Sequence, residues 1–138
     1  MAISLYSFTS NTKIESAKVN SNFTTIKTAI ERGLKDIINN TDGSTVTFDM
    51  SSGNIHTVTL GGNRTLAVTG VSVGQSFMIR LAQDVSGGRT VTWWSGIKWP
   101  GGAAPTLSTT GDTVDSFVFT CIDTNTYDGY FAGFGLSS

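Results

Sequence analysis

The chain has 138 residues with a formal net charge of −1 at pH 7, and 14 % of its residues are charged. A single core commonly occupies about 100–150 residues, so this length leaves room for one domain with a short appendage and excludes a multidomain enzyme. Few charges, together with many glycines, serines and threonines, favour short strands joined by tight turns.

The composition also argues against several kinds of function. The basic residues after position 40 are scattered along the chain and form no stripe that would neutralise phosphates, so nucleic-acid binding is not expected. One cysteine and one histidine provide neither an intrachain disulfide nor a cysteine-based metal cluster. No apolar run approaches the ~20 residues that span a bilayer, so membrane insertion is not expected either.

A helix is predicted over residues 10–40. Its apolar residues recur at spacings of four, three, four and seven, which is a heptad rhythm, and they are Val19, Phe23, Ile26, Ile30 and Ile37. Ser10 or Asn11 can cap the first turn. The stripe can pack against the chain's own β-part or against copies of the chain, and its polar opposite face and its position outside the strand pattern favour copies.

The heptad rhythm is too short to hold an assembly by itself. It lasts about three heptads, and Gly33 interrupts it where the next seam residue would fall. The β-part must therefore share the interface. Isoleucine at both seam positions disfavours two-stranded coiled coils, so we predict a homotrimer.

From residue 44 onward the period of the apolar pattern is two, which predicts a β-domain. Glycine- and asparagine-rich turns separate seven expected strands, at 45–49, 55–60, 65–69, 76–82, 89–94, 114–121 and 129–134. Short strands spaced roughly every 8–12 residues fit a sandwich, a jelly roll or a barrel, and we predict a mainly β fold with a small antiparallel β-sandwich of jelly-roll type. One alternation should form the core: Val46, Phe48, Val58, Leu60, Phe77, Ile79, Leu81, Val91, Trp93, Phe117 and Phe119.

The loop over residues 96–111 is the longest irregular stretch. Trp99, before a proline, can fold onto the core as a lid or present its ring outward, and the lid is the expectation. Alternation places Trp93 and Trp94 on opposite sheet faces, so Trp94 is expected to point away from the core. The candidate residues for contact with a ligand or another subunit are Trp94, Trp99 and Tyr127.

No catalytic residue, cofactor or metal site is expected. His56 lies within a strand pattern and is interpreted as a surface or interface residue, and Cys121 as a small buried hydrophobe. Carboxylates that would pair for glycoside hydrolysis lie mostly beside turns, where aspartate commonly bonds to the local backbone, and they are Asp49, Asp84, Asp112, Asp115, Asp123 and Asp128. Enzymatic activity is therefore not expected.

Two parts of the chain resemble proteins of tailed-bacteriophage virions. Residues 8–30 contain the aliphatic-Asn-x-Asn-Phe run Val19-Asn20-Ser21-Asn22-Phe23, which resembles a segment near the N-termini of phage fibre proteins. The runs LGGNRTLAVTG, GQSFMIRLAQDVSGGRTVTW and GIKWPGGAAPTLSTTGDTVDSFVF are similar to a β module of phage tail-fibre and other virion-surface proteins. The similarity depends on Gln-Asp, Gly-Gly, Trp-Pro and Asp-Ser-Phe landmarks.

The resemblance implies a non-enzymatic, homo-oligomeric virion component without a cofactor, assembled in the host cytoplasm. We expect residues 1–43 to form an anchoring arm and oligomerising helix, and residues 44–138 a displayed β-domain that touches other virion proteins or the host surface. The arm is short and apolar, so its side chains are expected to bind the particle: Ile3, Leu5, Tyr6 and Phe8. The alternatives are a capsid decoration or head-fibre protein and a module that binds host polysaccharide.

Overall fold

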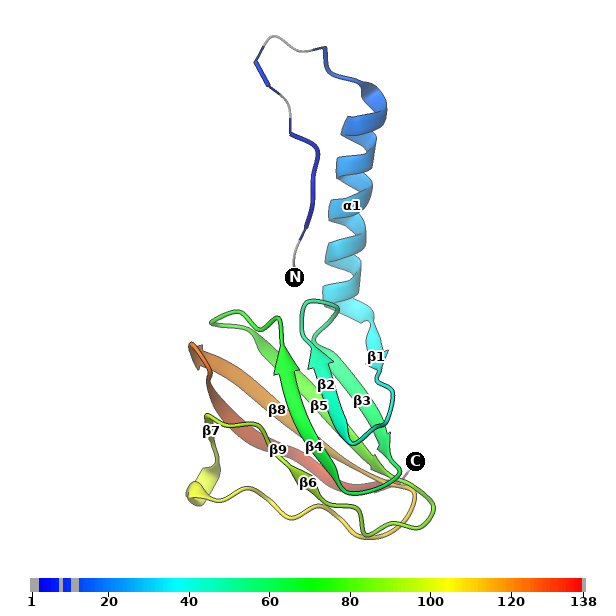
Figure 1. Ribbon diagram of the computed structural model, residues 1–138, viewed down its shortest axis with the longest axis vertical. Coiled ribbons are helices and arrows are strands. Elements are labelled where there is room, and N and C mark those ends of the chain that lie inside the picture. The colour runs from blue at the N-terminus through cyan, green and yellow to red at the C-terminus, as the bar shows by residue number, and fades with distance from the viewer. Residues whose placement is uncertain (1–2, 8, 11–12, 138) are drawn as a thin grey trace.

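The computed structural model describes residues 3–7, 9–10 and 13–137, and shows one helix that projects from a two-sheet β-domain (Figure 1). The helix α1 is Ser16–Lys35. The strands are β1 (Ile37–Asn39), β2 (Thr45–Asp49), β3 (Ile55–Leu60), β4 (Arg64–Thr69), β5 (Ser76–Gln83), β6 (Val91–Thr92), β7 (Ile97–Lys98), β8 (Thr113–Asp123) and β9 (Thr126–Ser137), with a 3₁₀ turn η1 (Pro100–Gly102) before β8. The expected mainly β class with an N-terminal helix is confirmed.

The helix is shorter than the spacing of its apolar residues predicts. The carbonyl of Glu15 accepts the first helical bonds, from the amides of Lys18 and Val19, so the expected cap at Ser10 is wrong; Asn11 lies outside the described residues. At the other end, Ile37 is not part of the helix and begins strand β1. A heptad position thus coincides with the first residue of the sheet.

All seven expected strands are present, but their pairing is not antiparallel. The larger sheet has the order β1-β3-β5-β8-β9-β7, and the smaller one has the order β2-β4-β6. Every pairing among β1 to β6 is parallel, as is that of β7 with β9, and only β5–β8 and β8–β9 are antiparallel. The prediction of an antiparallel, jelly-roll-like sandwich is therefore wrong.

The chain from β1 to β6 forms a coil of three turns. Successive strands alternate between the two sheets, so each turn adds one strand to each sheet and the next turn stacks in parallel on the last. This is the arrangement of a β-solenoid, in which the opposite sheet takes the place of the crossover helix that parallel strands otherwise need. The long β8–β9 hairpin then closes the larger sheet on the side of β5.

The core lies between the two sheets. Nine of the predicted core residues are buried, and Val91 and Trp93 are partly buried against them; the nine are Val46, Phe48, Val58, Leu60, Phe77, Ile79, Leu81, Phe117 and Phe119. Cys121 is buried as predicted. These residues occupy every second position of their strands, which is the alternation that directs one face of each sheet inward.

Aromatic side chains of the 93–107 loop cover the part of the larger sheet that the three-stranded sheet leaves open. Trp93 lies 4.9 Å from Phe117 and Trp94 lies 4.8 Å from Phe119 between ring centroids, and Trp99 packs on the same cluster. The lid expected of Trp99 is confirmed. The expectation that Trp94 points away from the core is wrong, because β6 ends at residue 92 and the two-residue alternation ends with it.

Candidate functional site

The helix α1 presents an exposed apolar stripe. The side chains of Phe23 and Ile30 are 68 % and 55 % exposed, Ile26 is 36 % exposed, and Val19 is half-buried. Their heptad spacing places them on one helix face, and α1 stands away from the sheets (Figure 1). A contiguous apolar surface of this kind marks a site of interaction with protein or membrane.

The N-terminal arm lies beside the helix rather than free of it (Figure 1). The Asn22 side chain binds the backbone of Tyr6 twice: its Oδ1 accepts the Tyr6 N–H at 2.8 Å, and its Nδ2 donates to the Tyr6 carbonyl at 3.3 Å. Ile3, Leu5 and Tyr6 remain exposed beside the helix, and Phe8 lies outside the described residues. The arm therefore widens the apolar surface of the helix.

The contact of Asn22 gives a structural role to the Asn-x-Asn-Phe run. A primary amide presents one acceptor and two donors, so it can satisfy both polar groups of an extended peptide unit. The sequence reasoning identified the run but not its partner. The sequence signal for this contact is an amide side chain, Asn22, beside the apolar stripe of the predicted helix.

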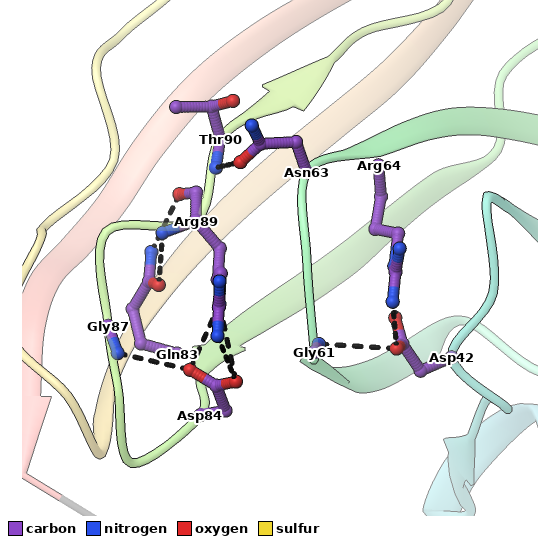
Figure 2. Close-up of polar contacts among 9 residues, drawn as sticks. All are labelled: Asp42, Gly61, Asn63, Arg64, Gln83, Asp84, Gly87, Arg89 and Thr90. Atoms are coloured by element: carbon purple, nitrogen blue, oxygen red, sulfur yellow. Dashed lines mark hydrogen bonds and ion pairs between the residues drawn. The ribbon is translucent and has the colours of Figure 1, made fainter.

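Two of the four landmarks, Gln-Asp and Gly-Gly, lie at one end of the strands, at the last residue of β5 and in the turn after it, where Figure 2 shows Gln83, Asp84 and Gly87. Gln83 is buried at the end of β5; its Nε2 donates to the carbonyls of Arg89 and Ser108 at 2.9 Å each, and its Oε1 accepts the Arg89 N–H at 2.8 Å. Three bonds from one side chain hold the turn after β5 and the loop before β8 together.

Two ion pairs reinforce this end of the domain. Asp84 accepts two hydrogen bonds from Nε and one from Nη2 of Arg89, the shortest 2.7 Å, and also accepts the Gly87 N–H (Figure 2). Asp42 pairs in the same way with Arg64, at 2.8 and 2.6 Å. The arginine hydrogen bonds lower the pKa of both carboxyl groups. Paired with cations, these aspartates are poorly suited to act as acids.

Asp115 is a further landmark with a structural role. It is buried, and its carboxylate accepts the N–H groups of Ser108 at 2.7 Å and Gly135 at 2.8 Å, so it joins the loop before β8 to the end of β9. Asp49 likewise accepts from the backbone and hydroxyl of Ser51. Asp49 and Asp84 thus bond to the local backbone, as their positions beside turns indicated, whereas Asp115 bonds to backbone that is distant in the sequence.

His56 is completely buried, so its interpretation as a surface or interface residue is wrong. Its Nδ1 lies 3.1 Å from Nδ2 of Asn40, its Nε2 lies 3.1 Å from the Gly53 carbonyl, and its ring contacts Phe48 edge-on. Burial lowers the pKa of His56. No grouping of three or more histidine, cysteine, aspartate or glutamate side chains suited to a metal occurs in the described part of the chain.

The candidate ligand-contact residues are occupied by packing. Tyr127 is buried, which raises its pKa, and its ring lies edge-on to Trp94 at 5.9 Å. The indole N–H of Trp94 is buried without a hydrogen-bond partner among the residues that the structure describes. A pocket of about 230 Å³ beside Val91 and Leu107 is smaller than the ~300–1,000 Å³ typical of small-molecule sites. The geometry therefore favours the helix and arm as the functional surface.

Comparison with protein families matches residues 41–120 to a family described as "Putative phage tail fibre C-terminal domain". The match covers more than half of the chain. The chain belongs to this family. The matched residues of this tail-fibre domain include β2 to β7 and eight of the eleven residues of β8, together with the residues drawn in Figure 2. The helix and arm lie outside the match.

The membership makes the chain a phage tail-fibre module and a component of the virion. A structural role follows from the family. Within this chain, Gln83 and Asp115 are positions that hold the β-domain together. Comparisons with curated proteins and with solved structures gave no match. In the described residues no helix is both long and apolar enough to cross a membrane.

Proposed function

We propose that this tail-fibre domain is a non-enzymatic, homotrimeric surface protein of the virion, gathered by α1 and displaying its β-domain. The observation that carries the proposal is the exposed stripe of Phe23, Ile26 and Ile30 on a helix that projects from the sheets. In a monomer this stripe would face water, whereas in a trimer the three stripes would cover one another.

The polar face of the helix supports the same reading. Lys27 and Glu31 form an exposed ion pair at 3.9 Å, and Thr24 and Thr25 donate back to backbone carbonyls of the preceding turn. These exposed side chains bond to one another or to the helix backbone, so the apolar side of α1 is the one that requires a protein partner.

Replacing Ile26 and Ile30 with Asp tests the trimer. Light scattering should then give the mass of one chain, because two buried carboxylates per helix would be left without partners. The matched control carries the same change on the polar face, Thr24→Asp with Thr28→Asp, and should keep the wild-type mass. An unchanged mass for the Ile26 and Ile30 variant would exclude the helix as the interface.

We further propose that the arm attaches the protein to another virion protein. Ile3, Leu5 and Tyr6 are exposed next to the helix, so they can contact both the helix of a neighbouring chain and the particle. Deleting residues 2–9 should abolish incorporation into virions and leave the circular dichroism of the β-domain unchanged. Normal incorporation would contradict this assignment.

The proposal also includes contact between the displayed β-domain and the host surface. Of the aromatic residues proposed for sugar binding, Trp94 and Trp99 pack on the core and Tyr127 is buried. A glycan array with the wild type and with Trp99→Ala tests whether any sugar binds. Without a signal, display on the particle, as a tail fibre, head fibre or decoration protein, is the function that remains.

A further inference from the structure

The outer face of the larger sheet carries a row of apolar side chains in direct cross-strand register. Ile37 pairs with Ile55, Ile55 with Met78, Met78 with Val118, and Val118 with Tyr130, so the row crosses β1, β3, β5, β8 and β9. Residues paired in this way lie on the same side of a sheet. We call these five residues the outer row.

The outer row faces away from the core. The next residues along three of its strands, His56, Ile79 and Phe117, are buried between the sheets, and side chains of neighbouring residues point to opposite faces. At its two ends Ile37 is 51 % exposed and Tyr130 is 49 % exposed. The row is thus an apolar line on a surface where alternation predicts polar residues.

We propose that the outer row is the second half of the interface between copies of this chain. This inference rests on the proposed function, and it identifies which part of the β-domain shares the interface with α1. The partner is a second copy because the row continues the helix stripe along the chain. Only Asp36 separates the end of α1 from Ile37, which occupies the heptad position after Phe23 and Ile30.

The exposed apolar area of α1 is too small for a stable interface, which supports a second interface patch. If each side chain offers on the order of 150–200 Å² when fully exposed, the stripe of α1 presents on the order of 350 Å², well below the ~800 Å² that each partner buries in a stable interface. The outer row adds roughly 300 Å² on the same basis, and the exposed arm residues add to it. Helix, arm and row together approach the area that a specific assembly needs.

The residues beside the row have the character of an interface rim. On β5, Ser76 and Arg80 flank Met78, and Ser76 bonds to Thr120 on the neighbouring strand at 2.9 Å. An apolar centre with a polar border is the usual composition of a protein–protein interface. The outer row therefore resembles a contact surface more than a solvated sheet face.

The test places a charge in the centre of the row. Val118→Lys should reduce the mass in sedimentation velocity from that of the trimer to that of smaller species, because the lysine would be buried between copies. Thr47→Lys is the matched control, since Thr47 is an exposed strand residue of the smaller sheet, and it should keep the trimer mass. Circular dichroism and the urea midpoint of each variant report whether the β-domain is folded.

A second variant covers the case in which Val118→Lys does not fold. Tyr130 is at the exposed end of the row, so Tyr130→Lys leaves the core untouched and should weaken the assembly at least tenfold in dissociation constant. If the Asp substitutions in α1 give monomers while both Lys variants keep the trimer mass, the outer row is not an interface and the proposed function still stands. If the wild type itself is a monomer, both proposals are wrong.

Discussion

Gln83 is the side chain whose loss should most affect the closure of the β-domain. Replacing it with Met keeps its length and removes all three of its hydrogen bonds, which leaves the N–H and carbonyl of Arg89 and the carbonyl of Ser108 without this partner. A buried polar group without a partner costs about 1–3 kcal/mol. Since Arg89 and Ser108 are only half-buried and water can reach part of them, we expect a loss of about 3 kcal/mol in the free energy of unfolding.

Urea unfolding followed by tryptophan fluorescence measures this loss, because Trp93 and Trp94 lie in the adjoining loop. A loss of this size lowers the midpoint by on the order of 1–2 M. Gln75→Met is the comparison: Gln75 also makes three hydrogen bonds, but it is less buried, so water should replace them and the loss should be smaller. The reasoning would be refuted if the urea midpoint of Gln83→Met equalled that of the wild type, or if it were higher than the midpoint of Gln75→Met.

Three further predictions follow from single residues. Asn22→Ala should release the arm and speed its cleavage in limited proteolysis, whereas Asn20→Ala, an exposed neighbour, should not; equal cleavage rates would contradict the arm contact. Burial lowers the pKa of His56 below its ordinary 6.5, so the unfolded chain binds more protons than the folded one. The free energy of unfolding should therefore fall as the pH drops below 6.5, before the aspartates, whose ordinary pKa is 3.8, begin to titrate. His56→Gln should show no such slope in urea titrations. Gly87→Ala should destabilise the domain far more than Gly88→Ala, because both residues have positive φ but only the Cβ at Gly87 would clash with the Thr109 carbonyl oxygen of the facing loop. Similar thermal midpoints for the two variants would contradict this clash.

The positions of the strands could be predicted because burial on one face imposes a period of two on the sequence. Val46 and Phe48, or Phe77 and Ile79, are separated by residues that face water or the outer sheet surface, and this pattern survives whatever strand lies alongside. The core was predictable for the same reason.

The pairing of the strands could not be predicted from the same pattern. Glycine-rich turns such as the one around Gly61 and Gly62 show that the chain reverses direction, but they do not show whether the next strand pairs with the last one or crosses to the opposite sheet. In this domain it crosses each time until β6. Each strand from β1 to β4 then pairs in parallel with the strand one turn further along the chain. This pairing joins residues that are distant in the sequence, so the local pattern does not reveal it.

The candidate site was predictable only where its residues lie in one regular element. The stripe on α1 follows from spacing, whereas the contact between Asn22 and Tyr6 joins residues from two segments and leaves no periodic signal. Ile37 shows the limit of the heptad argument, since it fits the helix rhythm and belongs to β1. The same residue begins the outer row. Its side chain is exposed, as its place in the stripe predicted, but it lies in a strand and not in the predicted helix.

The mass of the native chain in solution tests the central claim most directly. Sedimentation equilibrium over a dilution series should give three times the 14.6 kDa of one chain, and the same mass is expected in native mass spectrometry. A single-chain mass throughout the series would mean that the helix stripe faces water in the isolated protein, and would contradict the account.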